Sequence, residues 1–189
     1  MRNLFLHINM SLDGFIEDHA RDIDWHFVDD EFEEYINQVL RSIDGMIFGR
    51  SAHEKLAQYW PTAATQPEAS GRHLEAARMM NELPKYVVTN GRYQSEWQNT
   101  IVLSGDVATE VRRIKGEPGM DLALFAGARV VQSFIDLGLL DEYRLVVNPI
   151  LLGDGTSLFS RRHKRLSLEL MDATTFTSGA VVLRYRPTD

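Results

Sequence analysis

Cysteine is absent from the 189-residue sequence. Without it the chain can form no disulfide, no thiolate zinc or iron–sulfur site and no cysteine nucleophile. Long apolar runs are absent too, because none approaches the roughly 18 residues of a membrane-spanning helix. The apolar stretch at Leu4–Leu6 is too short for a signal peptide. We therefore expect a soluble cytoplasmic protein that has no membrane partner.

Positive charge is scarce. The sequence has 20 Lys and Arg against 27 Asp and Glu, which gives a formal net charge of −7. General affinity for nucleic acid needs a clustered positive field, so we expect no nucleic-acid partner. A small molecule is the expected ligand. An acidic protein that binds an anionic ligand must gather a few arginines in one pocket.

Motifs of several enzyme classes are missing. The six histidines show no H-E-x-x-H spacing, and no G-x-S-x-G marks a nucleophile, so we expect neither a metal site nor a serine nucleophile. The glycine at Gly127 is not part of G-x-G-x-x-G, which disfavours a standard Rossmann site. A basic run at 161–165 is interpreted as a solvated loop, with an anion site as its alternative.

Length and composition are those of one ordinary globular domain. Apolar residues make up 44% and charged residues 25% of the chain. A chain of this size buries roughly 70% of its unfolded surface, so it needs no covalent or metal staple. We expect a single domain over residues 1–189.

Short apolar strands alternate with helical patterns along the chain. The expected strands are Leu4–Asn9, Gly45–Phe48, Lys85–Thr89, Ile101–Leu103, Leu122–Phe125, Glu142–Asn148, Leu166–Thr175 and Ala180–Arg186. The expected helices are Asp29–Ser42, Ser51–Tyr59, His73–Leu83, Val107–Lys115 and Val130–Leu137. Such alternation predicts an α/β fold with a mostly parallel sheet, helices on both faces and an antiparallel C-terminal hairpin. Ser51, followed by Glu54, has the spacing of a capping box.

Distinctive residues follow several of the predicted strands. They are Asn9, the run Gly49-Arg50-Ser51, the pair Thr89-Asn90 and the pair Ala126-Gly127. The carboxyl ends of parallel strands share one edge of a sheet, where open α/β sheets bind ligands. This clustering predicts a binding site at that edge.

Each junction also has a purely structural interpretation. The stretch Phe125–Val130 brings small residues into a helix start, which suits either a pyrophosphate or a tight turn equally well. Arg50 offers a fork suited to phosphate, but an exposed arginine beside a helix start is the simpler reading. Arg92 is either a contact to a ribose phosphate or a solvated turn residue. One junction indicates little, whereas three on one edge favour a ligand.

Two further segments lie beside the first strand. Ser11–Ile16 can cover a flat ring and exclude water, or its apolar residues can simply pack. Trp25 and the acidic run Asp29–Glu31 open the first predicted helix. Acids at that place complement the helix dipole. The alternative is a carboxylate that binds a heterocycle or directs protonation.

Several motifs resemble one family. They are Ser11–Ile16, Gly127-Ala128 before a helix, Gly138–Glu142, Asn148–Gly155 and Leu158-Phe159. On these motifs, nearly the whole chain resembles the dihydrofolate reductase-like superfamily. It is most similar to the reductase domain of the bifunctional riboflavin-biosynthesis enzyme and its stand-alone relatives. The resemblance implies a three-layer α/β/α fold with a mixed, mainly parallel eight-stranded sheet.

The resemblance also implies a function. The expected activity is an NADPH-dependent reductase that transfers hydride to a small pterin- or pyrimidine-like substrate. The 5-amino-6-(5-phosphoribosylamino)uracil reductase step of riboflavin biosynthesis is the model for it. The alternatives are a non-catalytic nucleotide-binding module on the same fold, a dihydrofolate reductase proper, or a purely structural homodimer. A homodimer is the expected assembly, and the apolar stretch Tyr143–Val147 is consistent with it.

The residues that the resemblance assigns to the ligands share the strand-end edge. For the cofactor they are Asn9 and Ile16 at the nicotinamide carboxamide, Gly49, Arg50 and Ser51 at the phosphates, Thr89, Asn90 and Arg92 at the adenosine side and its 2′-phosphate, and Gly127, Ala128, Arg129 and Val130 at the pyrophosphate. Trp25 and Asp30 fall on the substrate side. Asp30 is the candidate proton donor, with water as the alternative, and no obligatory acid is identified.

The chain departs from the family pattern at three positions. Ala126 stands where a Gly-Gly pair is usual, Ala52 replaces a threonine, and Val131 replaces an aromatic residue. The Gly-Gly peptide is often cis in the family, and we expect the Ala126–Gly127 peptide to keep that geometry despite its cost of about 3–4 kcal/mol. The changes leave NADH as an alternative to NADPH.

Overall fold

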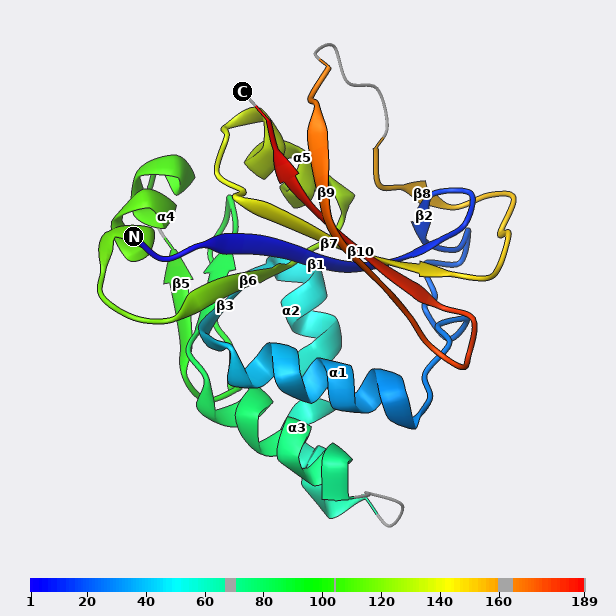
Figure 1. Ribbon diagram of the computed structural model, residues 1–189. Coiled ribbons are helices and arrows are strands. Elements are labelled where there is room, and N and C mark those ends of the chain that lie inside the picture. Colours follow the sequence, from blue (N-terminus) through cyan, green and yellow to red (C-terminus); the bar gives the residue numbers. More distant parts are fainter. Residues whose placement is uncertain (67–70, 104, 160–164, 189) are drawn as a thin grey trace.

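A central mixed sheet organises the chain. The computed structural model describes residues 1–66, 71–103, 105–159 and 165–188. Within them, eight strands form the sheet: β1 (Leu4–Ser11), β3 (Ile43–Gly49), β4 (Lys85–Val88), β5 (Thr100–Leu103), β6 (Asp121–Phe125), β7 (Glu142–Asn148), β9 (Leu168–Thr175) and β10 (Val181–Pro187). Their order across the sheet is β5-β4-β3-β6-β1-β7-β10-β9 (Figure 1). All neighbours are parallel except β7–β10 and β10–β9, as predicted.

Helices cover both faces of this sheet. One face carries α1 (Asp30–Arg41), α2 (Arg50–Ala57) and α3 (Gly71–Glu82), and the other carries α4 (Val107–Gly116) and α5 (Ala128–Asp136). Two apolar cores fill the spaces between the layers: α1 and α3 pack with Phe5 and Phe48, whereas α4 and α5 pack with Leu4 and Leu6. The predicted three-layer α/β fold is confirmed. None of the described helices is long and apolar enough to cross a membrane.

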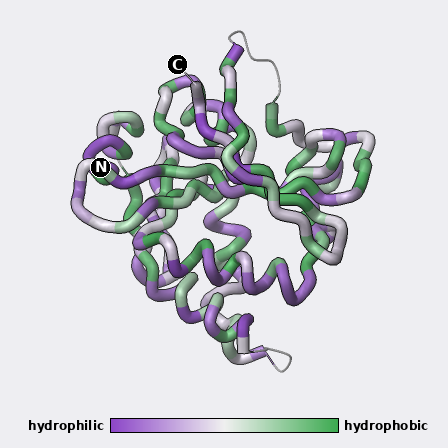
Figure 2. Tube along the Cα trace, viewed as in Figure 1, coloured by the Kyte–Doolittle hydropathy of each residue, from purple (hydrophilic) through white to green (hydrophobic). Residues whose placement is uncertain are grey.

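The strand β1 lies near the middle of the sheet and is buried on both sides. Leu4, Phe5 and Leu6 have no exposed surface, and successive side chains enter opposite cores. A strand that is covered on both faces requires a continuous apolar run rather than an alternating one. Figure 2 shows this apolar stretch passing through the centre of the molecule.

Helix starts follow the predictions in one case and not in another. Asp29 is the N-cap of α1, and its side chain accepts a hydrogen bond from the Phe32 amide at 2.8 Å. The predicted N-cap at Ser51 is wrong, because α2 begins at Arg50 and its N-cap is Gly49. The strand β3 runs directly into the helix, so no residue is left over for a separate cap. The carboxylate that should complete the capping box, that of Glu54, instead accepts from Arg50 Nε at 2.8 Å.

Two short elements were not predicted from the sequence. The strands β2 (Phe15–Glu17) and β8 (Thr156–Ser157) form a separate antiparallel pair, and Trp60–Thr65 form a 3₁₀ helix labelled η1. The β2–β8 pair depends on Gly155, which has a φ of +145°. A Cβ at that position would collide with the carbonyl oxygen of Glu17. Segments this short carry too little periodicity to be read from a sequence.

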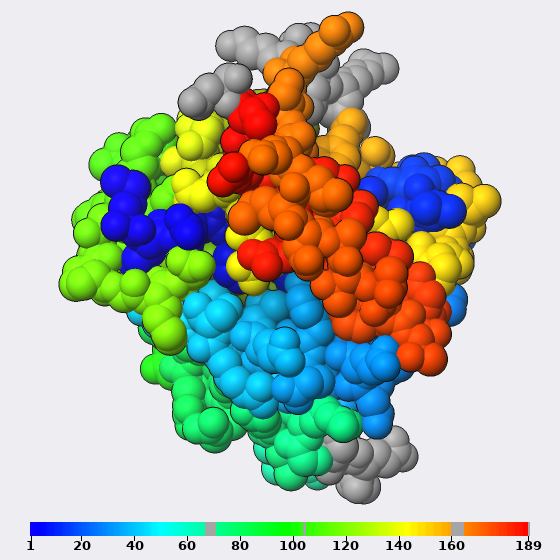
Figure 3. Space-filling model, in the orientation of Figure 1, coloured from blue at the N-terminus to red at the C-terminus, as the bar shows by residue number. Residues whose placement is uncertain are grey.

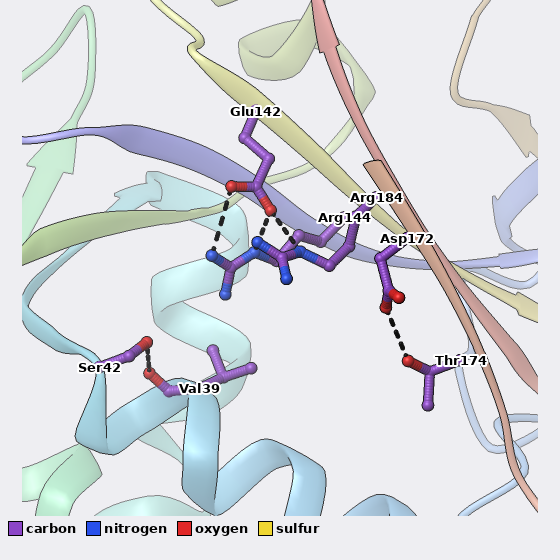
Figure 4. Close-up of polar contacts among 7 residues, drawn as sticks. All are labelled: Val39, Ser42, Glu142, Arg144, Asp172, Thr174 and Arg184. Atoms are coloured by element: carbon purple, nitrogen blue, oxygen red, sulfur yellow. Dashed lines mark hydrogen bonds and ion pairs between the residues drawn. The ribbon is translucent and has the colours of Figure 1, made fainter. Parts of the chain in front are cut away.

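A partly buried ion-pair network joins β7 to β10 on the α1 face (Figure 4). Glu142 accepts hydrogen bonds from Arg144 Nε and Arg184 Nε, each at 2.7 Å. Burial raises the pKa of Glu142, but the hydrogen bonds from Arg184 and Arg144 outweigh this effect and hold the pKa below its ordinary value. The Arg144 guanidinium also covers the Phe5 ring at 3.5 Å from its centroid. The carboxylate therefore keeps its charge where two strands meet.

The last two strands contrast with the rest of the sheet. All eight residues of β9 are exposed, and β9 has no described strand on its outer side (orange in Figure 3). Leu168, Leu170 and Met171 are 37%, 53% and 47% exposed. Of the basic run at 161–165, residues 161–164 lie outside the described residues.

Two buried histidines make the stability of the fold sensitive to pH. Burial and then Arg144 lower the pKa of His7 to about 3, and burial and then Lys85 lower the pKa of His53 to about 4. An unfolded histidine titrates near pH ~6.5, so below that pH the unfolded chain binds protons that the folded chain does not. Each histidine should therefore reduce the unfolding free energy by about 1.4 kcal/mol per pH unit as the pH falls from ~6.5 to ~4.

Urea unfolding at a series of pH values tests this expectation. In His7→Phe the new ring can stack between Tyr35 and Phe125 as the imidazole does, at centroid distances of 5.8 and 5.6 Å in the native protein. The variant should lose stability less steeply with falling pH, by about 1 kcal/mol per pH unit. Equal slopes for the variant and the native protein would show that His7 is not neutral in the folded state.

Candidate active site

The predicted site residues of four strands meet at one edge of the sheet. Parallel pairing places Gly49 beside Val88, and Phe48 beside Phe125. The junctions that follow β3, β4 and β6 are therefore neighbours. The end of β1 lies one strand further along, since β1 pairs with β6.

Two of these junctions touch. A Cβ added at Gly49 would lie 2.9 Å from Val130 Cγ2 and 3.8 Å from the Cβ of Ala126. The backbone of Gly49 has a φ of −77°, which any residue can adopt. Glycine is therefore needed here for close approach and not for an unusual conformation. The start of α2 and the start of α5 lie against each other as a result.

The start of α5 leaves backbone facing open space. Gly127 is the N-cap, with extended backbone and no side-chain cap, and a Cβ at this position would meet no atom within 4 Å. Amide groups in the first turn of a helix have no partner within the helix, and they favour an anion. Ala128, Arg129 and Val130 form this first turn, and the Val130 amide already donates to the Gly127 carbonyl at 3.1 Å, so the amides of Ala128 and Arg129 are the ones that face outward.

The predicted cis peptide at Ala126–Gly127 is wrong. The bond is trans, as is every described peptide bond. The chain passes from the extended conformation of Gly127 directly into α5. The helix start is thus reached with the isomer of lower energy for a bond that does not precede proline.

Arg50 and the segment after β4 lie close together. The guanidinium carbon of Arg50 lies over the Tyr93 ring, 5.3 Å from its centroid. An open cavity of about 960 Å³ adjoins this ring. Its lining residues come from the β4–β5 connection and the end of β5: Thr89, Asn90, Gly91, Arg92, Tyr93, Gln94, Val102, Leu103 and Gly105. The structure thus brings Arg50 beside the segment that contains Thr89, Asn90 and Arg92, while Ser51 is exposed on the first turn of α2.

At the end of β1, Asn9 is held by an asparagine that was not predicted as a site residue. The buried Asn148 donates to Asn9 Oδ1 at 3.2 Å and accepts from the Phe27 amide at 2.9 Å. It therefore ties β1, β7 and the segment before α1 together. The conspicuous run Asn148–Gly155 was the signal in the sequence. Ile16, on β2, is buried.

The loop after β1 is clamped to a distant loop. Asp13 accepts hydrogen bonds from the Ser11 hydroxyl at 2.6 Å, the Leu152 amide at 3.1 Å and the Gly153 amide at 2.8 Å. The Ser11 hydrogen bond is the main cause that lowers the pKa of Asp13, so the carboxylate stays charged. The motifs Ser11–Ile16 and Asn148–Gly155 are thus two halves of one clamp beside the strand ends.

The predicted substrate-side residues have their own partners. Trp25 donates from Nε1 to the Asp22 carbonyl at 3.1 Å and packs on His26. Asp30 opens α1 with a side chain that is 86% exposed, and its carboxylate pairs with Arg72 of α3 at 3.2 Å. No described contact joins either residue to the strand ends, and the roles assigned to them stay predictions.

Two buried polar atoms lie deeper on the α1 face. His7, two residues before Asn9 on β1, packs against Tyr35 of α1 at 5.8 Å between ring centroids. His7 Nε2 and the Tyr35 hydroxyl are buried and have no hydrogen-bond partner among the described residues. Burial raises the pKa of Tyr35 to about 12. Buried polar groups almost always have partners, so two unpaired atoms side by side are unusual in a folded protein.

Comparison with known proteins assigns the chain to a family. A family model described as the RibD C-terminal domain matches residues 2–182. The uncharacterized protein YyaP of Bacillus subtilis (strain 168) is 34% identical over 187 residues, which cover 97% of this chain and 94% of the relative.

Solved structures agree on the fold. One is a diaminohydroxyphosphoribosylaminopyrimidine deaminase/5-amino-6-(5-phosphoribosylamino)uracil reductase of Thermotoga maritima, with a TM-score of 0.69 at 16% identity, matched over 99% of this chain and 57% of that protein. Another is the dihydrofolate reductase of Enterococcus faecalis complexed with NADP(H), with a TM-score of 0.64 at 13% identity over 99% of this chain and 97% of that one. At these identities the likeness concerns the fold alone, which is that of dihydrofolate reductase.

The contact at Gly49 yields a direct test of how the two junctions are assembled. Gly49→Ala should destabilise the fold by about 1–3 kcal/mol, because the added methyl group overlaps Val130 Cγ2. The double variant Gly49→Ala/Val130→Ala should recover part of this loss, measured by urea unfolding. Additive losses in the double variant would show that the two junctions do not press on each other.

Proposed function

The chain belongs to the RibD C-terminal domain family, and from that premise we propose that it is an oxidoreductase that uses NADPH. It transfers hydride to a C=N or C=O group of a small planar heterocycle, pterin- or pyrimidine-like. The reductase named in the Thermotoga maritima structure is the model for this reaction. The cofactor named in the Enterococcus faecalis structure supports the choice of nicotinamide.

One observation carries the proposal. Two strand-to-helix junctions, after β3 and β6, converge with the β4–β5 connection, and together they supply what the phosphates of a dinucleotide need. The absence of a side chain at Gly127 lets a phosphate approach the backbone, and the first turn of α5 offers the amide groups of Ala128 and Arg129. Arg50 and Arg92 supply positive charge beside the large cavity in an otherwise acidic protein. These residues fit a dinucleotide, with the adenosine half along the cavity and the pyrophosphate at α5.

The chain's own part in the reaction is alignment and exclusion of water. When bound, reduced nicotinamide supplies the hydride. The backbone at Asn9 and Ile16 would hold the carboxamide of the nicotinamide. The clamp built on Asp13 fixes the loop after β1, to which Ile16 is connected. Holding two rings at near-attack distance away from water accounts for most of what a protein adds to hydride transfer.

The substrate lies on the α1 face in this proposal. There the His7 imidazole is neutral near pH 7, because burial and then Arg144 lower its pKa to about 3. The Tyr35 hydroxyl keeps its proton, because burial raises its pKa to about 12. Neither group exchanges a proton near pH 7, so neither is the proton donor in this proposal. The proton that follows hydride comes from water or from Asp30.

Titration with NADPH, followed by fluorescence of the three tryptophans, tests the proposal. Arg50→Ala and Arg92→Ala should each raise the dissociation constant for NADPH about tenfold, the equivalent of ~1.4 kcal/mol. Each variant removes a positive charge from the proposed anion site. Arg78→Ala is the matched control, since Arg78 pairs with Glu82 on the exposed side of α3. Its affinity should equal that of the native protein.

The outcomes separate the candidate functions. Oxidation of NADPH in the presence of a pterin, pyrimidine or quinone supports the reductase. Binding without oxidation across such a panel supports a nucleotide-binding module. If the native protein bound neither NADPH nor NADH, the reductase proposal would be wrong.

We also propose that the chain forms homodimers through β9. The stretch Tyr143–Val147 cannot provide the interface, because it lies in β7 and pairs with β1 on one side and β10 on the other. An edge strand presents unpaired amide and carbonyl groups, and a fully exposed edge invites pairing with another chain. The apolar side chains of Leu168, Leu170 and Met171 add a surface that water does not favour. A second copy of the same strand can pair with the backbone groups of β9 and cover its apolar side chains.

Light scattering after size exclusion tests the dimer. Leu170→Lys should shift the mass from about twice 21.6 kDa to 21.6 kDa at micromolar concentration, because charge disfavours burial at the interface. Met120→Lys, at another exposed position, is the control and should leave the mass unchanged. A monomeric native protein would contradict this assembly.

A further inference from the structure

The fully buried His53 lies one turn after Arg50 on α2. Its ring packs against the Phe48 ring at 5.7 Å and the Trp97 ring at 5.2 Å between centroids. Both ring nitrogens have partners: Nδ1 lies 2.8 Å from the Tyr93 hydroxyl, and Nε2 lies 3.1 Å from Thr100 Oγ1. A polar ring is thus fixed inside an aromatic core directly behind the cavity wall.

The direction of these hydrogen bonds follows from Thr100. Its hydroxyl donates to the Trp97 carbonyl at 2.6 Å. It must therefore accept from the N–H at Nε2 of His53. Burial and then Lys85 lower the pKa of His53 to about 4, so the ring is neutral near pH 7 and Nδ1 is an acceptor. The Tyr93 hydroxyl donates to it.

The anchored ring of Tyr93 has a defined place at the surface. It lines the cavity of about 960 Å³ and also a neighbouring one of about 520 Å³. The Arg50 guanidinium lies over the ring, and Arg50 Nε is held by Glu54 at 2.8 Å. His53 therefore fixes Tyr93, and Tyr93 with Glu54 fixes Arg50.

We propose that His53 is a positioning residue for nucleotide binding: through its hydrogen bond to Tyr93 it sets the wall that receives the adenosine half of the cofactor and holds Arg50 ready for the phosphate. This role rests on the proposed function. A tyrosine without its anchor rotates, and the arginine above it loses its support. Both must then be ordered when the nucleotide binds, which weakens affinity.

The test compares binding of NADPH and of 2′,5′-ADP, which lacks the nicotinamide half. Tyr93→Phe keeps the ring and removes only the hydroxyl, and His53→Leu removes the acceptor. Each variant should weaken the binding of both nucleotides by about three- to tenfold, which is the effect of losing one neutral hydrogen bond. The double variant should be no weaker than the worse single variant, because the two changes remove the same interaction.

Tyr59→Phe is the matched control. It removes another Tyr–His hydrogen bond, between the Tyr59 hydroxyl and His73 Nε2 at 2.8 Å, which joins the residue before η1 to α3. The nucleotide affinity of this variant should equal that of the native protein, at a temperature where all variants are folded by circular dichroism. Tyr93→Phe retains the packing of the ring and keeps the test valid if His53→Leu fails to fold.

The outcomes of these titrations distinguish the positioning role of His53 from the proposed function. Equal affinities in Tyr93→Phe and the native protein overturn the positioning role while leaving the proposed function intact. Loss of NADPH affinity without loss of 2′,5′-ADP affinity also overturns it, because the network would then act on the other half of the cofactor. A native protein that binds neither nucleotide overturns the proposed function and this inference with it.

Discussion

The candidate site depends on one steric constraint, the contact between the backbone of Gly49 and the start of α5. With a side chain at that position, the junctions after β3 and β6 would be forced apart, because Val130 and Ala126 already occupy the space. Their approach aligns two helix starts toward one region. The phosphate-binding chemistry proposed for this edge requires that alignment, since neither helix start alone distinguishes a ligand site from an ordinary turn.

Much of the fold could be predicted because β1, β3 and β6 are continuous apolar strands between two helical layers. Strand ends in a parallel sheet share an edge, so the clustering of Asn9, Gly49 and Gly127 follows from topology alone. Local rules failed where a tertiary contact took precedence. Arg50 occupies the first position of α2 and binds the carboxylate of Glu54, so the capping box at Ser51 does not form.

Other features depend on contacts between residues far apart in the sequence. Nothing near His53 in the sequence indicates that its partners are Tyr93 and Thr100, which come from the β4–β5 connection and from β5. The partners of Asp13 are likewise backbone amides about 140 positions later. The roles of His53 and Asp13 are therefore set by residues that the fold brings close to them, and a sequence does not show which residues these are.

The Asp13 clamp also determines how this edge of the molecule opens locally. One carboxylate joins the turn after β1 to the turn before β8, and Leu12 donates a further hydrogen bond to the Ile150 carbonyl at 2.9 Å. The two turns can separate only if all these bonds break together. Such coupling makes them one cooperative unit, so the amide protons of Leu12, Leu152 and Gly153 would exchange with solvent through a single opening event. Opening of this edge of the sheet would then be governed by the free energy of that event rather than by the flexibility of either turn.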